Sequence, residues 1–146
     1  MEKLTHNDFI NKAIECAKES VACGGFTYGA VVVNNGKIIA DSKIRRLPGN
    51  INHAETNAIA NALDVLGTND LIGCMLYSSC KPCGFCMGAI KWVGITEIYY
   101  AMDKSDADSI GYSDEIFFDE TVQILDHKIT NPDLLEYMKN WYGSRD

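Results

Sequence analysis

The chain has 146 residues, the length of one domain, and its apolar content of 47% is ordinary for a globular protein. Its net charge is -7 and it shows no basic footprint, which argues against a nucleic-acid partner. It has no apolar run of about eighteen residues and no apolar signal core near the N-terminus, so we expect no membrane partner and a cytoplasmic location. Residues 1–146 are therefore expected to form a single domain.

Apolar periodicity and turn residues predict the elements of the N-terminal half. Thr5 can cap the first helix, Asn35-Gly36 is typical of a type I′ hairpin turn, and Gly67 can stop the second helix. In chain order, we expect a helix after Thr5, strands at 29–33 and 38–40, a loop at 47–52, and a helix from His53 to Leu66.

The C-terminal half continues with alternating strands and helices. Asn131 followed by Pro132 is a cap and first-turn signal for the last helix. We expect a strand at 75–79, a helix from Cys83 to about Val93, strands at 96–101 and 122–125, and a helix from Asn131 to Trp141. This order predicts an α/β fold with a five-strand mixed sheet and helices on both faces.

Two short segments carry metal-binding chemistry: His53-Ala54-Glu55 and Pro82-Cys83-Gly84-Phe85-Cys86. One imidazole and two thiolates leave the fourth tetrahedral position of a zinc ion open, which is typical of a catalytic site. Both segments are predicted at helix starts, where the helix dipole favours thiolates, and Cys83 and Cys86 lie on one face of a helix turn.

Other interpretations of the cysteines fit less well. A structural zinc knuckle needs a fourth protein ligand, and a redox pair or an iron–sulfur site that includes Cys80 leaves His53 and Glu55 unexplained. In the cytoplasm we expect no disulfides, so the remaining cysteines are predicted to be buried free thiols: Cys16, Cys23 and Cys74.

The pattern H-x-E with P-C-x-x-C is the signature of zinc-dependent nucleobase deaminases. Through it the chain resembles the cytidine deaminase-like superfamily, and it looks most similar to bacterial guanine deaminases. The resemblance is carried by residues 28–33, 53–55, 79–90 and the acidic stretch 105–114. It implies a three-layer α-β-α deaminase fold, a zinc cofactor, and a Glu55 that moves protons between water and the base.

The resemblance also implies substrate contacts. Tyr28 is expected to stack on the base, Ala54 to offer its backbone N–H, and Asp114 to contact the base or shuttle protons. The superfamily usually has a substrate-binding asparagine after the second strand, and this position falls on Ile44 here, which cannot form that hydrogen bond. The residues near enough to replace it are Ser42, Arg45 and Asn52.

The expected activity is hydrolytic deamination of a small heterocyclic substrate, with guanine to xanthine plus ammonia as the first choice. Cytosine, another aminopurine, a pterin or a triazine are alternatives. Transfer-RNA adenosine deamination is a further alternative, which the acidic charge disfavours. A catalytically silent zinc-binding subunit is another, but such a subunit would not need Glu55 as a proton carrier. We expect a homodimer, in which the aromatic residues of the last helix either pack locally or close over a pocket.

Overall fold

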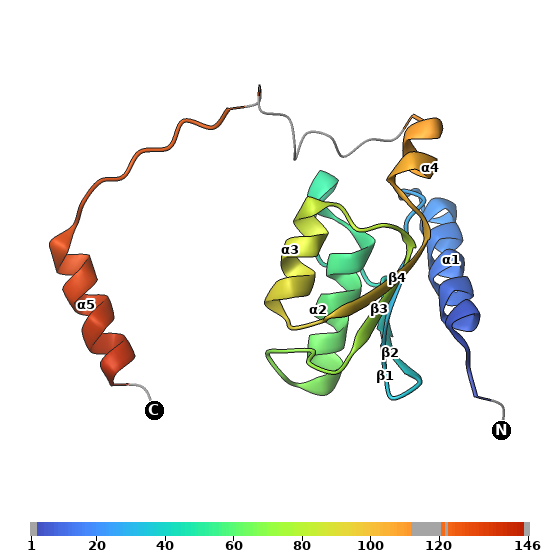
Figure 1. Ribbon diagram of the computed structural model, residues 1–146, viewed down its shortest axis with the longest axis horizontal. Helices are drawn as coiled ribbons and strands as arrows, with labels where there is room; N and C mark the ends of the chain where they lie inside the picture. Colours follow the sequence, from blue (N-terminus) through green and yellow to red (C-terminus); the bar gives the residue numbers. More distant parts are fainter. Residues whose placement is uncertain (1–2, 112–120, 122, 145–146) are drawn as a thin grey trace.

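A four-stranded mixed sheet lies at the centre of the computed structural model, which describes residues 3–111, 121 and 123–144 (Figure 1). The strands are β1 (Ala30–Asn34), β2 (Lys37–Asp41), β3 (Met75–Cys80) and β4 (Glu97–Met102), in the spatial order β2-β1-β3-β4. β1 is antiparallel to β2 and β3, whereas β3 and β4 are parallel and are joined by a helical crossover.

Helices cover both faces of this sheet, so the predicted three-layer arrangement is confirmed (Figure 1). α1 (His6–Ala22) lies on one face, and α2 (Ala54–Leu66) and α3 (Gly84–Trp92) lie on the other. The alternation of β1 explains the two cores. Val31 and Val33 pack with Phe9 of α1, while Val32 packs with the residues of α2 and α3.

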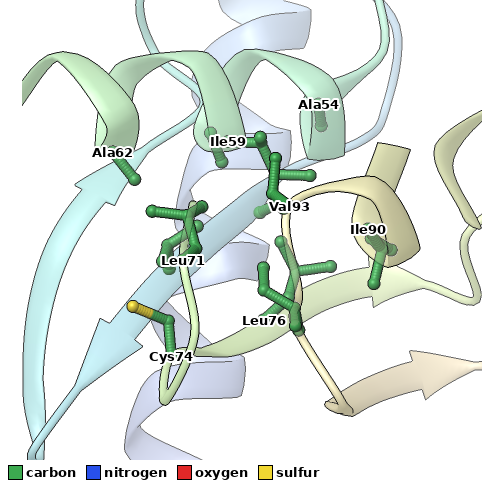
Figure 2. Packing of buried hydrophobic residues seen from close by; sticks show 12 residues of the cluster. Ala54, Ile59, Ala62, Leu71, Cys74, Leu76, Ile90 and Val93 are labelled. Carbon is green, nitrogen blue, oxygen red and sulfur yellow. The ribbon is translucent and has the colours of Figure 1, made fainter. Parts of the chain in front are cut away.

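The larger core lies between the sheet and the α2–α3 layer. Figure 2 shows Ile59 and Ala62 from α2, Ile90 from α3 and Leu76 from β3 converging on one another. Ala58 and Ala62 of α2 are completely buried, and such small side chains allow a helix to approach a sheet closely. This close packing fixes the position of α2, whose first turn carries Glu55.

Local signals set most of the element boundaries. Thr5 and Asp8 form a reciprocal capping box at the start of α1. Asn35 and Gly36 both have positive φ, at 52° and 74°, as the β1–β2 hairpin turn requires. Gly67 ends α2 in a left-handed conformation. These boundaries agree with the sequence predictions.

Two predictions about the fold and its cysteines are wrong. The described part of the predicted fifth strand, residues 123–125, is not in the sheet, and Ile124 and Leu125 are 85% and 84% exposed. Only two apolar residues lie between Gln123 and Asp126, and so short an apolar pattern does not specify a strand. Cys23 is also exposed, because it follows the end of α1, whereas Cys16 and Cys74 are buried as predicted.

The C-terminal region differs from the rest of the chain. A short helix that the sequence did not predict, α4 (Lys104–Ser109), follows β4. The last helix, α5 (Pro132–Gly143), begins at an Asn131 cap as predicted, and it stands apart from the sheet and its covering helices (Figure 1). No helix within the described part of the chain has the length and apolar content that crossing a bilayer requires.

The contact between α1 and the start of β1 leaves no room for a side chain at Gly29. A Cβ there would lie 2.1 Å from the Ala13 carbonyl oxygen and 2.4 Å from the Ala17 nitrogen. We expect Gly29→Ala to lower the free energy of unfolding by about 3 kcal/mol or more, because backbone must move. Chemical denaturation measures this. Gly88→Ala in α3, where a Cβ meets nothing within 4 Å, should instead be neutral or stabilising. Equal effects of the two substitutions would contradict the packing.

Candidate metal centre and active site

His53, Cys83 and Cys86 form a compact group of metal-ligating side chains. The Nδ1 atom of His53 lies 3.4 Å from Sγ of Cys83 and 3.3 Å from Sγ of Cys86. All three ligand atoms lie within 4.8 Å of one another. Cys86 is completely buried, and Cys83 is 8% exposed. The structure thus brings together the three residues that the sequence singled out.

The spacing of these atoms fits a zinc ion. A tetrahedral zinc with Zn–S near 2.3 Å and Zn–N near 2.0 Å separates a sulfur ligand from a nitrogen ligand by about 3.5 Å. The observed N–S distances of 3.3 and 3.4 Å are close to that value. Three soft or borderline donors, with no fourth ligand in this group among the residues that the structure describes, match a zinc site with one open position.

The starts of two helices hold this group in place. His53 is the N-cap residue of α2 and Cys83 is the N-cap residue of α3, and neither side chain forms a capping hydrogen bond. Helix capping therefore does not compete with metal binding for either side chain. Cys86 lies within the first turn of α3, so it faces the same side as Cys83.

The two thiols have different proton affinities in the protein without metal. A hydrogen bond with Cys86, with help from the Cys86 and Phe85 backbone N–H groups and from His53, lowers the pKa of Cys83 to about 6. The same hydrogen bond, burial and the nearby Glu55 carboxylate raise the pKa of Cys86. Cys83 therefore loses its proton readily, whereas Cys86 retains its own. Metal binding must displace the proton that remains on Cys86.

Glu55 lies beside this group and is itself buried, with 5% of its surface exposed. Its Oε1 accepts a hydrogen bond of 2.6 Å from Ser78 Oγ, and its Oε2 accepts one of 3.4 Å from Cys86 Sγ. Ser78 on β3 thus anchors one carboxylate oxygen and leaves the other on the side of the cysteines. Sequence reasoning missed Ser78, although a serine within a buried strand was a signal that a polar partner lies nearby.

A cavity of about 640 Å³ opens onto these residues. Its lining combines the site residues with apolar and aromatic side chains, including Phe26, Tyr28, Ala54, Met87 and Pro82, and with the polar Asn52. A mostly apolar cleft with a few convergent polar groups is the usual form of a small-molecule site. Glu55, His53 and Cys83 all line it.

Only some of the residues predicted to contact the substrate line this cavity. Tyr28 and Ala54 line the cavity, which is consistent with contact to a base there. Ile44 does not line it, and the side chain is 63% exposed. Asp114 lies outside the described residues. Asn52, which the sequence offered only as one substitute for Ile44, immediately precedes His53 and lines the cavity.

Comparison with known sequences places the chain in a family. Residues 3–102 match the cytidine and deoxycytidylate deaminase zinc-binding region. The chain belongs to this family. The predicted superfamily and its zinc cofactor are therefore confirmed, and His53, Cys83 and Cys86 are the group that could hold the zinc.

Individual relatives refine this placement. The chain is 38% identical over 120 residues to guanine deaminase from Bacillus subtilis, covering 80% of this chain and 77% of the relative. The crystal structure of a Bacillus subtilis guanine deaminase superposes with a TM-score of 0.84 at 32% identity, covering 98% of this chain and 97% of the other. A transfer-RNA-specific adenosine deaminase from Aquifex aeolicus is 34% identical, covering 66% of each chain.

The metal group can be tested against the alternative that includes Cys80. Cys83→Ala should lose most of the bound zinc, because two ligands in a site of this type rarely retain the ion. Elemental analysis of purified protein gives the zinc content per chain. The matched control is Cys80→Ala, since Cys80 is buried but is not in the His53–Cys83–Cys86 group. Full zinc retention in Cys83→Ala, or iron that both variants lose, would overturn the assignment.

Proposed function

We propose that this protein hydrolytically deaminates guanine to xanthine and ammonia, with zinc at the His53–Cys83–Cys86 group. The observation that carries the proposal is the buried Glu55 carboxylate beside that group in one cavity. The similarity to guanine deaminases in both sequence and structure supports guanine as the substrate.

Zinc held by these ligands supplies a water of lowered pKa at neutral pH. The protein residues do the rest. Glu55 Oε2 faces the metal group while Ser78 holds Oε1, so Oε2 is the atom positioned to accept a proton from the attacking water. The water oxygen bonds to the amino-bearing carbon, and Glu55 passes the proton to a ring nitrogen. The carbon–nitrogen bond then breaks, and ammonia leaves with the second proton.

The cavity walls bind and orient the base. Tyr28 is proposed to stack on the ring. The Ala54 N–H, in the first turn of α2, has no partner within its own helix and is proposed to donate to the ring.

The net charge of -7 favours a free base over transfer RNA as the substrate, because nucleic-acid binding needs clustered cations. Cytosine, other aminopurines, pterins and triazines belong in the same substrate screen. The single-domain extent and the cytoplasmic location stay predictions.

We also propose that the protein is a homodimer, on the basis of α5. None of its residues is buried. Its large apolar residues recur at helical spacing and are exposed by 42 to 67%: Leu134, Leu135, Tyr137, Met138, Trp141 and Tyr142. An amphipathic helix of this kind gains stability by burying its apolar face. A second copy of the chain is the proposed occupant.

Glu55→Gln tests the enzymatic proposal. The amide can still accept from Ser78 but cannot take up and return a proton, so kcat for guanine should fall by about 10²-fold or more while zinc content is unchanged. Xanthine formation and elemental analysis give the two readings. Glu15→Gln on the exposed face of α1 is the matched control. A variant that keeps more than about a tenth of the wild-type rate would remove Glu55 from proton transfer. A wild type that releases ammonia from another heterocycle instead would correct the substrate.

Leu135→Asp tests the dimer. In a monomer this residue is 58% exposed, so the substitution should change little. If α5 packs on a second copy, a buried charge should raise the dimer dissociation constant by about tenfold or more. Light scattering across a dilution series measures the mass. Asn140→Asp places the same charge outside the apolar set of α5. A wild type that stays monomeric, or two variants that dissociate alike, would count against the proposal.

A further inference from the structure

Phe26 is a large apolar residue that remains exposed at the candidate active site. It is 65% exposed, although it lines both the large cavity that contains Glu55 and a neighbouring cavity of about 160 Å³. Covering apolar surface of this kind with a ligand is favourable, because the surface is removed from water. Phe26 therefore offers a contact that neither the metal group nor the proton transfer uses.

The backbone that carries this ring is held by hydrogen bonds on both sides. Before the ring, the Gly25 N–H donates to the Ser20 carbonyl oxygen at 2.7 Å, at the end of α1. After it, the Gly29 N–H donates to Ser79 Oγ at 3.1 Å, and the Ser79 N–H donates to the Gly29 carbonyl oxygen at 2.9 Å. Only residues 26–28 lie between these contacts. A ring on so short a span is positioned before a ligand arrives, which lowers the ordering cost of binding.

Tyr28 is the second aromatic residue of this span, and it also lines both cavities. Glu55, His53 and Cys83 line the large cavity and not the smaller one. The two aromatic residues therefore belong to the part of the wall where the cavities adjoin, whereas the metal group belongs to the large cavity alone. A planar ligand at the metal group reaches this wall with the part of it that points towards the smaller cavity.

We propose that Phe26 stacks, beside Tyr28, on the second ring of a fused two-ring heterocycle, and that the site thereby prefers such substrates to single-ring bases. This inference rests on the proposed deaminase function, which places the reacting ring at Glu55. A fused ring extends from there to the aromatic wall, whereas a single ring leaves Phe26 exposed. The large cavity, at about 640 Å³, is in the range of sites that hold drug-sized ligands, which exceed a single-ring base. Guanine, other aminopurines and pterins belong to the fused class.

Xanthine and uracil form a matched pair of probes, because xanthine is uracil fused to an imidazole ring. Neither is turned over, so their dissociation constants for the zinc-loaded protein report on binding of the second ring and not on the deamination step. Phe26→Ala should raise the dissociation constant of xanthine by about fivefold or more, as the loss of a base–aromatic stack does, and should leave that of uracil unchanged. Ligand-detected NMR titration measures both constants, including weak ones.

Two further variants control this test. Phe26→Tyr keeps the ring and should bind xanthine as the wild type does. Trp92→Ala removes an aromatic residue that is 91% exposed and lines neither cavity, so it should change neither constant. Because Phe26 is exposed, its removal should change the melting temperature little.

The outcomes separate this inference from the proposed function. An unchanged xanthine constant in Phe26→Ala, an equal loss for uracil, or a loss of dimer mass without a change in binding would overturn the role of Phe26. A wild type that shows the expected binding pattern but forms no xanthine from guanine refutes guanine as the substrate and leaves the preference for two-ring heterocycles in place.

Discussion

Holding His53, Cys83 and Cys86 within 4.8 Å of one another is the constraint on which the rest of this structure depends. The ligands come from the starts of two helices that are thirty residues apart in the chain. β3 ends just before Cys83, so the sheet sets the position of α3. α2 is set by its close packing on the sheet through completely buried alanines, Ala58 and Ala62. The metal group thus depends on the quality of the core beneath it.

The segment between β2 and α2 is tied down by polar contacts rather than by regular structure. Asn61 Nδ2 donates to the carbonyl oxygens of Asp41 and Ile44, at 2.9 and 3.2 Å. Arg46 Nε donates in turn to Asn61 Oδ1 at 2.6 Å. These bonds use the backbone of Ile44 and not its side chain, which explains how Ile44 can follow the second strand and still face solvent.

Elements that a single local rule determines can be predicted well from the sequence. Features that depend on contacts between residues distant in the chain are predicted less well. The Thr5 cap and the Asn35-Gly36 turn are local, and both were predictable. The ligand triad was predictable because its chemistry depends on residue type and spacing. The placement of Ser78 under Glu55 joins two elements that no periodicity links, and the exposure of Ile124 depends on the absence of a partner strand among the described residues. Neither follows from a local pattern.

Part of the cavity wall and a metal-ligating residue lie in one stretch of chain. Asn52 contacts the neighbouring Asn57, and between them lie His53 and Glu55. Hydrogen bonds that orient the wall of the cavity therefore also set the entry of the chain into α2, and with it the position of a metal ligand. In such an arrangement, a substitution in this part of the cavity wall acts on the same backbone that carries the metal-ligating His53. Substitutions in this segment should consequently couple non-additively to the site, as contacting residues in one hydrogen-bond network generally do.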